Sequence, residues 1–177
     1  ISQILPGLTL ARRLKENYPH LHITLGGPIF SVNAKQLLGH PEFFDEFCHS
    51  VVTFEGEEPL HRLLTTLKKG SALKEVPNLL FCEDEKVTLN KERVELRFEE
   101  LPAPTFEGLP MDLYLSPYPI LPVLQSRGCY WGKCTFCTHS FVYGHRYGKQ
   151  RTKQMVDELE DLAKKYQTKY FTFSDEA

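Results

Sequence analysis

The chain has 177 residues, of which 41% are hydrophobic and 25% are charged, and its formal net charge is -2. These ordinary globular values exclude intrinsic disorder and collagen-like repeats, and the weak acidity without a basic stripe argues against nucleic acid as the main partner. No apolar run approaches the roughly 20 residues of a membrane-spanning helix, and none resembles a signal peptide.

The first part of the chain alternates predicted helices and strands. Leucines three and four residues apart predict a helix over 5–18, which Pro19 ends. Short apolar runs predict strands at 22–25 and 51–54, and a helix-like stretch lies around 34–38. This alternation is typical of a parallel α/β sheet.

A helix near 58–69 completes this pattern, because it follows the second strand and ends with two lysines and Gly70. A doubly wound, Rossmann-like domain normally has about five or six strands, and only two are predicted here. We therefore expect residues 1–75 to be the C-terminal part of such an α/β domain.

A hairpin and a proline-rich stretch follow. The segments 78–82 and 86–90 flank an acidic turn and predict the two strands of the hairpin. Six of the twelve prolines then fall between 99 and 122. Proline at that density removes backbone donors and stiffens the chain, so we expect residues 76–121 to be a hairpin and a Pro-rich linker between two domains.

The remaining residues, 122–177, predict the first βαβ unit of a partial (β/α) barrel. A strand at 123–126 enters a cysteine-rich loop, a helix capped by Thr152 follows, and a second strand is expected at 170–173. The basic, aromatic segment 143–151 is predicted to be a solvated loop, and its histidine to be exposed. One apolar stripe of the helix is expected to comprise Val156, Leu159, Ala163 and Tyr166.

Five cysteines are distributed unevenly along the chain. Cys129, Cys134 and Cys137 fall within nine residues. An odd number clustered in this way does not fit a disulfide framework and indicates a reducing, cytoplasmic setting. Cys48 and Cys82 lie in apolar runs, and we expect both to be buried, inert thiols.

The cysteine loop predicts a metal centre. Three thiolates on one short loop can hold three irons of a cubic iron–sulfur cluster and leave the fourth iron without a protein ligand. A metal with an open position can bind substrate and do chemistry. Two alternatives stay open: a structural zinc site with His139 as a closely spaced fourth ligand, and three thiols with redox or packing roles.

The residues 126–129 and 134–137 resemble the opening of the radical S-adenosylmethionine (SAM) enzymes. The resemblance implies that the three cysteines hold a [4Fe–4S] cluster, that SAM chelates the fourth iron, and that one electron cleaves SAM to methionine and a 5′-deoxyadenosyl radical. It also places Phe136 against the adenine. The commonest family pattern has three residues between the first two cysteines, and this loop has four, among them the flexible Gly132.

The end of the last predicted strand offers further candidates for SAM binding. Ser174, Asp175 and Glu176 lie where many relatives use a Gly-Gly-Glu segment to bind the SAM amino group. Those glycines do not occur here, and the sequence resembles instead the acidic strand end of cobalamin-associated relatives. A carboxylate pairs well with a partly desolvated amine. The alternative is a solvated acidic strand end.

The first part of the chain resembles the C-terminal half of the cobalamin-binding domain that many radical SAM enzymes carry. Loops at the carboxyl ends of parallel strands form a ligand crevice, and glycines there let the backbone approach a bulky nucleotide. The Asp-x-His-x-x-Gly motif of such domains does not occur in the chain, and a tight turn without a ligand is the alternative. The resemblance implies that the cobalamin-binding residues are Gly26, Gly27, Pro28, Ser31, Glu55, Gly56 and Glu57.

Together the resemblances imply a cobalamin-dependent radical SAM enzyme that uses a [4Fe–4S] cluster, SAM and cobalamin to methylate a carbon of a small-molecule or peptide substrate. They also imply an electron donor such as flavodoxin or ferredoxin. Two alternatives are radical SAM sulfur insertion, cyclisation or rearrangement without methyl transfer, and a non-catalytic zinc or iron–sulfur module. The chain starts without Met and stops after a predicted strand, so we expect a piece of a longer enzyme that is inactive alone.

Overall fold

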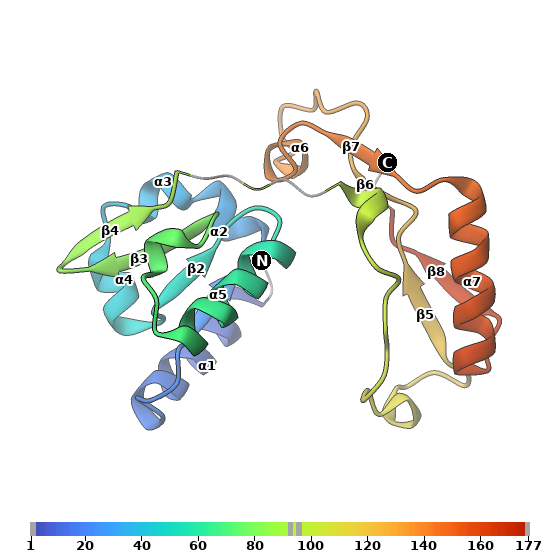
Figure 1. Ribbon diagram of the computed structural model, residues 1–177, viewed down its shortest axis with the longest axis horizontal. Coiled ribbons are helices and arrows are strands. Elements are labelled where there is room, and N and C mark those ends of the chain that lie inside the picture. The colour runs from blue at the N-terminus through green and yellow to red at the C-terminus, as the bar shows by residue number, and fades with distance from the viewer. Residues whose placement is uncertain (1–2, 92–93, 95–96, 176–177) are drawn as a thin grey trace. The chain divides into compact units, whose positions relative to one another are not determined.

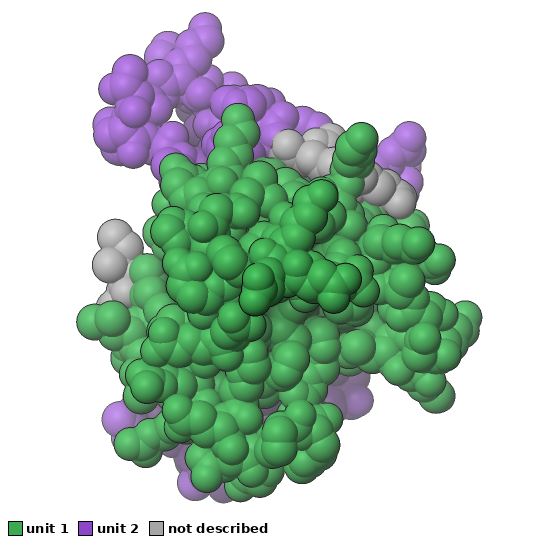
Figure 2. All heavy atoms as spheres, turned by 90° about the vertical axis from the view of Figure 1, so that its left-hand side faces the viewer, with its two compact units in different colours: residues 1–95 green, residues 96–177 purple. Residues whose placement is uncertain are grey.

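The computed structural model describes residues 3–91, 94 and 97–175. The chain divides into two compact units, Ile1–Glu95 and Leu96–Ala177 (Figure 2). Among the described residues no sheet is shared between them: the four-stranded sheet belongs to unit 1 and the two-stranded sheets belong to unit 2 (Figure 1). The fold is mixed α/β with partly parallel sheets, as predicted. A search of the described helices finds none that is both long and apolar enough to span a bilayer.

Unit 1 is built on a four-stranded mixed sheet. β1 and β2 are parallel, and the other neighbouring pairs are antiparallel. In sheet order the strands are β1 (Thr24–Gly26), β2 (Ser50–Val52), β3 (Leu79–Glu83) and β4 (Lys86–Leu89). The helical segments are α1 (Ile4–Asn17), α2 (Pro28–Val32), α3 (Ala34–Leu37), α4 (Pro41–Glu46), α5 (Glu57–Lys69) and the short η1 (Leu73–Glu75).

The predicted helices near 5–18 and 58–69 are confirmed as α1 and α5. Glutamates in the first turn of α5 and lysines in its last turn complement the helix dipole. Gly70 ends α5 in the left-handed region at φ 67°, a conformation that glycine adopts without a steric penalty. On the inner side of α5, Leu63 is almost fully buried and packs against core residues of the sheet.

The predicted hairpin is confirmed, but it belongs to the sheet of unit 1 and not to a linker. Asp84 and Glu85 form its turn with φ values of 50° and 58°, which suit the twist of a two-residue hairpin. β3 pairs with β2, so that Val51 faces Leu80 in the register, and both side chains are fully buried. The hairpin therefore adds two strands to the two that we expected in this part of the chain.

The two isolated cysteines differ in exposure. Cys48 is fully buried, as predicted, and burial raises the pKa of its thiol to about 12, which favours an inert thiol. Cys82 on β3 is only partly buried, although burial also raises its pKa. The expectation of a buried Cys82 is therefore only partly met.

We expect two histidines beside β2 to make the stability of unit 1 depend on pH. Burial and then the neighbouring His49 lower the pKa of His22, and burial and then Lys15 lower the pKa of His49. The two rings lie 5.1 Å apart, and His22 Nε2 and Ser50 Oγ are 2.8 Å apart. Since the unfolded histidines bind protons at a higher pH than the folded ones, stability is lost as the pH falls through about 6.5.

We expect faster hydrogen exchange of the β2 amides at pH 5.5 than at pH 7.5, after correction for the intrinsic exchange rates. A His22→Gln/His49→Gln double variant should weaken this pH dependence, because it removes both titrating rings. His61→Gln alters an exposed histidine on α5 and is the matched control. An unchanged pH dependence in the double variant would contradict the assignment.

Unit 2 contains a βαβ unit and a separate two-stranded ribbon. β5 (Ile120–Val123) and β8 (Tyr170–Phe173) are parallel, and α7 (Thr152–Tyr166) connects them in the chain. β6 (Ser126–Gly128) and β7 (Tyr147–Lys149) form the antiparallel ribbon. The remaining segments are α6 (His139–Val142), η2 (Phe98–Glu100) and η3 (Met111–Leu113).

Two predictions on the strands of unit 2 are wrong in detail. The strand expected at 123–126 is divided, because β5 already ends at Val123 and β6 begins at Ser126. Pro122 lies inside β5, where it is tolerated because β5 pairs along only one edge within the described residues. The segment 143–151, expected as a solvated loop, instead contributes β7, although its His145 is exposed as predicted.

The predicted helix at 152–166 is confirmed, but its start and its buried face differ. Thr152 is the first helical residue, and Arg151 occupies the cap position without a side-chain hydrogen bond. Val156 is 48% exposed, so it lies outside the core. The residues that face the core are Met155, Leu159, Leu162 and Tyr166.

The Pro-rich stretch packs against unit 2. Phe106 and Met111 contact the core formed by β5 and α7. The Phe106 N–H donates to Tyr166 Oη at 2.7 Å, and the two rings meet edge to face. Phe98 is also buried. The stretch expected to be a linker is therefore largely part of unit 2.

Candidate functional site

The cysteine loop starts directly after β6, and a glycine fixes its starting direction. Gly128 has φ +88°, and a Cβ on it would lie 2.1 Å from the carbonyl oxygen of Arg146. Only glycine permits this approach of β6 to the residue before β7. The chain then enters the loop at Cys129.

The three cysteines of the loop are free thiols. Cys129 is partly buried, whereas Cys134 and Cys137 are exposed. Gly132, at φ +59°, donates its N–H to Cys129 Sγ at 3.5 Å, and the N–H of Cys137 donates to the carbonyl of Cys134 at 3.3 Å. Within the described part of the chain, no three His, Cys, Asp or Glu side chains are grouped to hold a metal ion. The convergence of the three thiols stays a prediction.

The donor set nevertheless fits an iron–sulfur cluster. Three free thiolates are the ligand type that such clusters use, and backbone N–H groups directed at sulfur tune them. Two of the three thiols are exposed and therefore accessible to an incoming iron ion. His139, the zinc ligand of the alternative, is partly buried, and its ring lies 4.7 Å from that of Tyr143.

Large aromatic side chains on the same loop face solvent. Phe136, the predicted adenine contact, is 88% exposed, and Tyr130 and Trp131 are also exposed. The Lys133 ammonium lies 5.4 Å from the Trp131 ring centroid, at cation–π distance. Apolar surface gathered in this way indicates a site that a ligand or another part of a protein covers.

The end of β8 lies next to the start of β6. The Ser174 N–H donates to the Val123 carbonyl at 2.9 Å and so extends the β5–β8 ladder by one bond. The Asp175 carboxylate accepts the Gln125 N–H at 3.2 Å and the Ser126 hydroxyl. Asp175 is thus partly buried and hydrogen-bonded, unlike a solvated strand end. Glu176, the other acidic candidate, is outside the described residues.

The candidates for cobalamin binding in unit 1 gather at one edge of the sheet. Gly26 is the last residue of β1, and Gly27 and Pro28 lead directly into α2. Gly56 and Glu57 begin α5 after β2. Because β1 and β2 are parallel, these two turns lie at the carboxyl ends of adjacent strands, where α/β sheets bind ligands.

Ser31 connects these two turns. Its Oγ accepts the Phe54 N–H at 2.7 Å and donates to the Gly27 carbonyl at 3.4 Å, and the side chain is buried. Phe54 has φ 60°, an uncommon value for a residue with a side chain. Glu55, the next candidate along the chain, is buried as well.

Sequence reasoning missed Asn78, which holds the turn after β2 from the other side. The backbone carbonyl of Asn78 accepts both the N–H and the Oγ1 hydroxyl of Thr53, at 2.9 and 2.8 Å. The side-chain amide of Asn78 donates to the backbone carbonyls of Glu55 and Val94, at 3.4 and 3.0 Å. The only signal in the sequence was a polar residue at the start of an apolar run.

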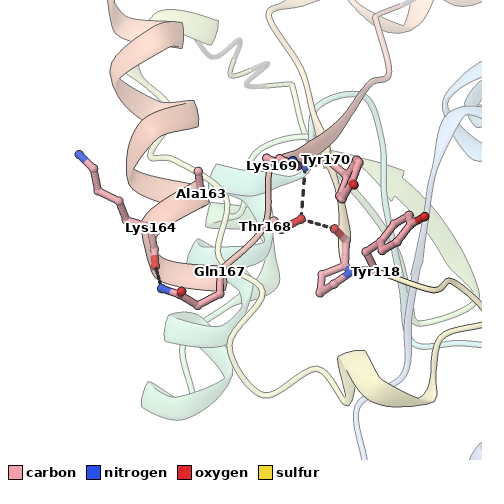
Figure 3. A pocket seen from close by; sticks show the side chains of 8 residues that line it. Tyr118, Ala163, Lys164, Gln167, Thr168, Lys169 and Tyr170 are labelled. Carbon is pink, nitrogen blue, oxygen red and sulfur yellow. Dashed lines mark hydrogen bonds between the residues drawn. The ribbon is translucent and has the colours of Figure 1, made fainter.

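A hollow of about 610 Å³ lies elsewhere in unit 2 (Figure 3). Tyr118 and Tyr170 stack there at 4.5 Å, and the Thr168 hydroxyl donates to the Pro119 carbonyl. These residues lie at the amino ends of β5 and β8, whereas the cysteine loop follows the carboxyl ends. No candidate residue predicted from the sequence lines this hollow.

Comparison with solved structures shows which proteins share this fold. Over about 95% of its length, the chain is similar in structure to part of the cobalamin-dependent radical SAM enzymes. One of them is the radical SAM methyltransferase TsrM of Kitasatospora setae, at 20% identity and a TM-score of 0.63 over 95% of the chain. Another is the cobalamin-dependent radical SAM enzyme OxsB, at 24% identity and a TM-score of 0.68 over 98%.

A relative is also found by sequence. A protein of Pyrococcus horikoshii that is named an uncharacterized methyltransferase is 29% identical over 170 residues, or 95% of this chain. No protein-family model matches the chain. The chain spans 36% of that relative, 33% of TsrM and 24% of OxsB, so it corresponds to about a third or less of these proteins.

Proposed function

We propose that the chain is part of a cobalamin-dependent radical SAM methyltransferase and that Cys129, Cys134 and Cys137 are the ligands of its [4Fe–4S] cluster. The observation that carries the proposal is a loop with three free cysteines that follows β6, in the connection between β5 and α7 of a βαβ unit. The similarity in fold to radical SAM enzymes over most of the chain supports it.

The cluster, when bound, supplies the electron for the reductive cleavage of SAM at its open iron. The protein holds and orients that cofactor. We assign Phe136 to cover the adenine, because it is the most exposed aromatic side chain of the loop. We assign Ser174 and Glu176 to the part of SAM that approaches the sheet, because Asp175 between them bonds to Gln125 and Ser126 at the start of β6.

We assign the cobalamin to the edge of unit 1 where β1 and β2 end. Gly26, Gly27 and Pro28 form one turn of this edge, and Glu55, Gly56 and Glu57 form the other. Ser31 supports the site by holding the two turns together, because it is buried and its hydroxyl bonds within the chain. In this proposal unit 1 is the partial cobalamin-binding domain, and unit 2 is the start of the radical SAM core.

The methyl acceptor is a carbon of a small-molecule or peptide substrate, and the electron comes from a donor such as a flavodoxin or a ferredoxin. Radical SAM chemistry without methyl transfer is the second candidate, because it needs the same cysteine loop. The methyltransferase name of the Pyrococcus relative favours methyl transfer. Retention of cobalamin by the full-length protein during purification would separate the two candidates.

The proposal is tested by anaerobic reconstitution with iron and sulfide. The wild-type protein should bind about four irons per chain and show the visible absorbance of an iron–sulfur cluster. A Cys129→Ala/Cys134→Ala/Cys137→Ala variant should lose both, whereas Cys82→Ala in unit 1 should keep them. Equal iron content in the wild type and the triple variant, or one zinc per chain after purification, would overturn the proposal.

A further inference from the structure

The Asp175 carboxylate lies where the parallel ladder between β5 and β8 ends. The last backbone bond of that ladder runs from the Ser174 N–H to the Val123 carbonyl. Two residues after Val123, the Gln125 N–H has left the ladder and needs another acceptor. The Asp175 carboxylate supplies it at 3.2 Å, so a side chain continues the pairing where the backbone stops.

The other carboxylate oxygen of Asp175 fixes the next residue. It accepts the hydroxyl of Ser126, a buried residue that opens β6. The Gln125 carbonyl in turn accepts the Gln150 N–H at 2.9 Å, which attaches the same point to the end of β7. Hydrogen bonds to Asp175, after β8, and to Gln150, after β7, therefore fix the point where the chain passes from the β5–β8 sheet to the β6–β7 ribbon.

The two residues fixed in this way, Gln125 and Ser126, lie shortly before the cysteine loop. Ser126 precedes Cys129 by three residues, and Gly128 between them packs on the Arg146 carbonyl with no space for a side chain. Little freedom is left between the Asp175 carboxylate and the first cysteine. The position of the end of β8 thus determines where the loop starts.

We infer that Asp175 is a positioning residue that fixes the start of the cysteine loop on the end of β8. The inference rests on the proposed function, because a fixed start of the loop affects cluster binding only if the loop holds the cluster. It assigns Asp175 a positioning role, because one carboxylate oxygen accepts the Gln125 N–H and the other accepts the Ser126 hydroxyl.

Hydrogen exchange in the metal-free protein tests the contact itself. Asp175→Ala removes both acceptor oxygens, and Ser126→Ala removes the hydroxyl while keeping the Gln125 bond. We expect the Gln125 amide to exchange about tenfold faster in Asp175→Ala and less than that in Ser126→Ala, as expected for a lost hydrogen bond. Asp161→Ala changes an exposed carboxylate on α7 and should leave this amide unchanged.

Cluster retention tests the consequence. In the reconstituted full-length protein we expect both variants to release iron to a chelator faster than the wild type, by about tenfold for Asp175→Ala, the lower end of the usual loss on removing a group that supports metal ligands. The Asp175→Ala/Ser126→Ala double variant should release iron no faster than Asp175→Ala alone, because Asp175→Ala already removes the contact that Ser126→Ala removes.

The outcomes separate this inference from the proposed function. A wild-type protein that assembles no cluster defeats the proposed function, whereas the exchange of the Gln125 amide still tests the contact. If the cluster forms and both variants retain iron as the wild type does, the inference is wrong and the proposed function stands. A loss of SAM affinity in Asp175→Ala alone, without faster exchange or iron release, would show direct SAM binding instead and overturn the inference.

Discussion

Replacing Gly128 by alanine is expected to cost unit 2 at least about 2–3 kcal/mol of unfolding free energy, the range found for strained backbone combined with a steric clash. The new methyl group would lie 2.1 Å from the Arg146 carbonyl oxygen, and φ +88° is unfavourable for any residue with a Cβ. β6 and β7 would have to separate. Chemical denaturation followed by the fluorescence of Trp131, the single tryptophan of the chain, measures the loss.

Gly108→Ala is the matched control for this experiment. Gly108 also has a positive φ, +81°, but nothing lies within 4 Å of the Cβ that alanine would add. It should therefore show only the conformational cost of about 1–2 kcal/mol. A Gly128→Ala variant no less stable than Gly108→Ala would contradict the close approach of β6 to Arg146.

Replacing Asn78 by alanine should destabilise unit 1 by about 2–5 kcal/mol, because one buried and one part-buried carbonyl lose their donor and alanine is unfavourable in the left-handed region. Asn78 is almost fully buried and has φ 53°, a conformation that asparagine tolerates better than most residues. The carbonyls that lose their donor are those of Glu55 and Val94. Hydrogen exchange of the β2 and β3 amides measures the loss.

Asn78→Gly separates the loss of the side-chain hydrogen bonds from the backbone strain. Glycine adopts φ 53° without strain but cannot donate to Glu55 or Val94, so the glycine variant should be intermediate in stability between the wild type and Asn78→Ala. Both variants keep the backbone carbonyl of Asn78, which accepts the two hydrogen bonds from Thr53, so the loss comes from the side chain and from the backbone conformation. An alanine variant within about 0.5 kcal/mol of the wild type would fall in the range of ordinary surface substitutions and contradict this role.

The elements with long local signals were predictable from the sequence. α1, α5 and α7 have hydrophobic periodicity over three or more turns, and their predicted bounds differ from the observed ones by about a residue. α2 and α4 were missed, although each begins with a proline, Pro28 and Pro41, which is typical of the first helical position. β5 was misplaced because its partner β8 determines its ends, and its proline argued against a strand.

The candidate site was predictable only where its residues are close in sequence. The cysteine loop and the turns after β1 and β2 have composition and spacing that indicate a ligand. The hydrogen bond from Ser126 to Asp175 joins residues 49 positions apart, and that from Asn78 to Glu55 joins residues 23 positions apart. Neither contact has a local pattern, because tertiary packing alone brings the partners together.

Electron paramagnetic resonance of the reconstituted, reduced full-length protein, recorded without and with SAM, is the most direct test of a cluster with an open iron. We predict the signal of a reduced [4Fe–4S] cluster that changes when SAM is added, because SAM would bind the iron that lacks a cysteine. A signal that stays the same with SAM, or no signal in a protein that holds zinc at Cys129, Cys134 and Cys137, would contradict the account.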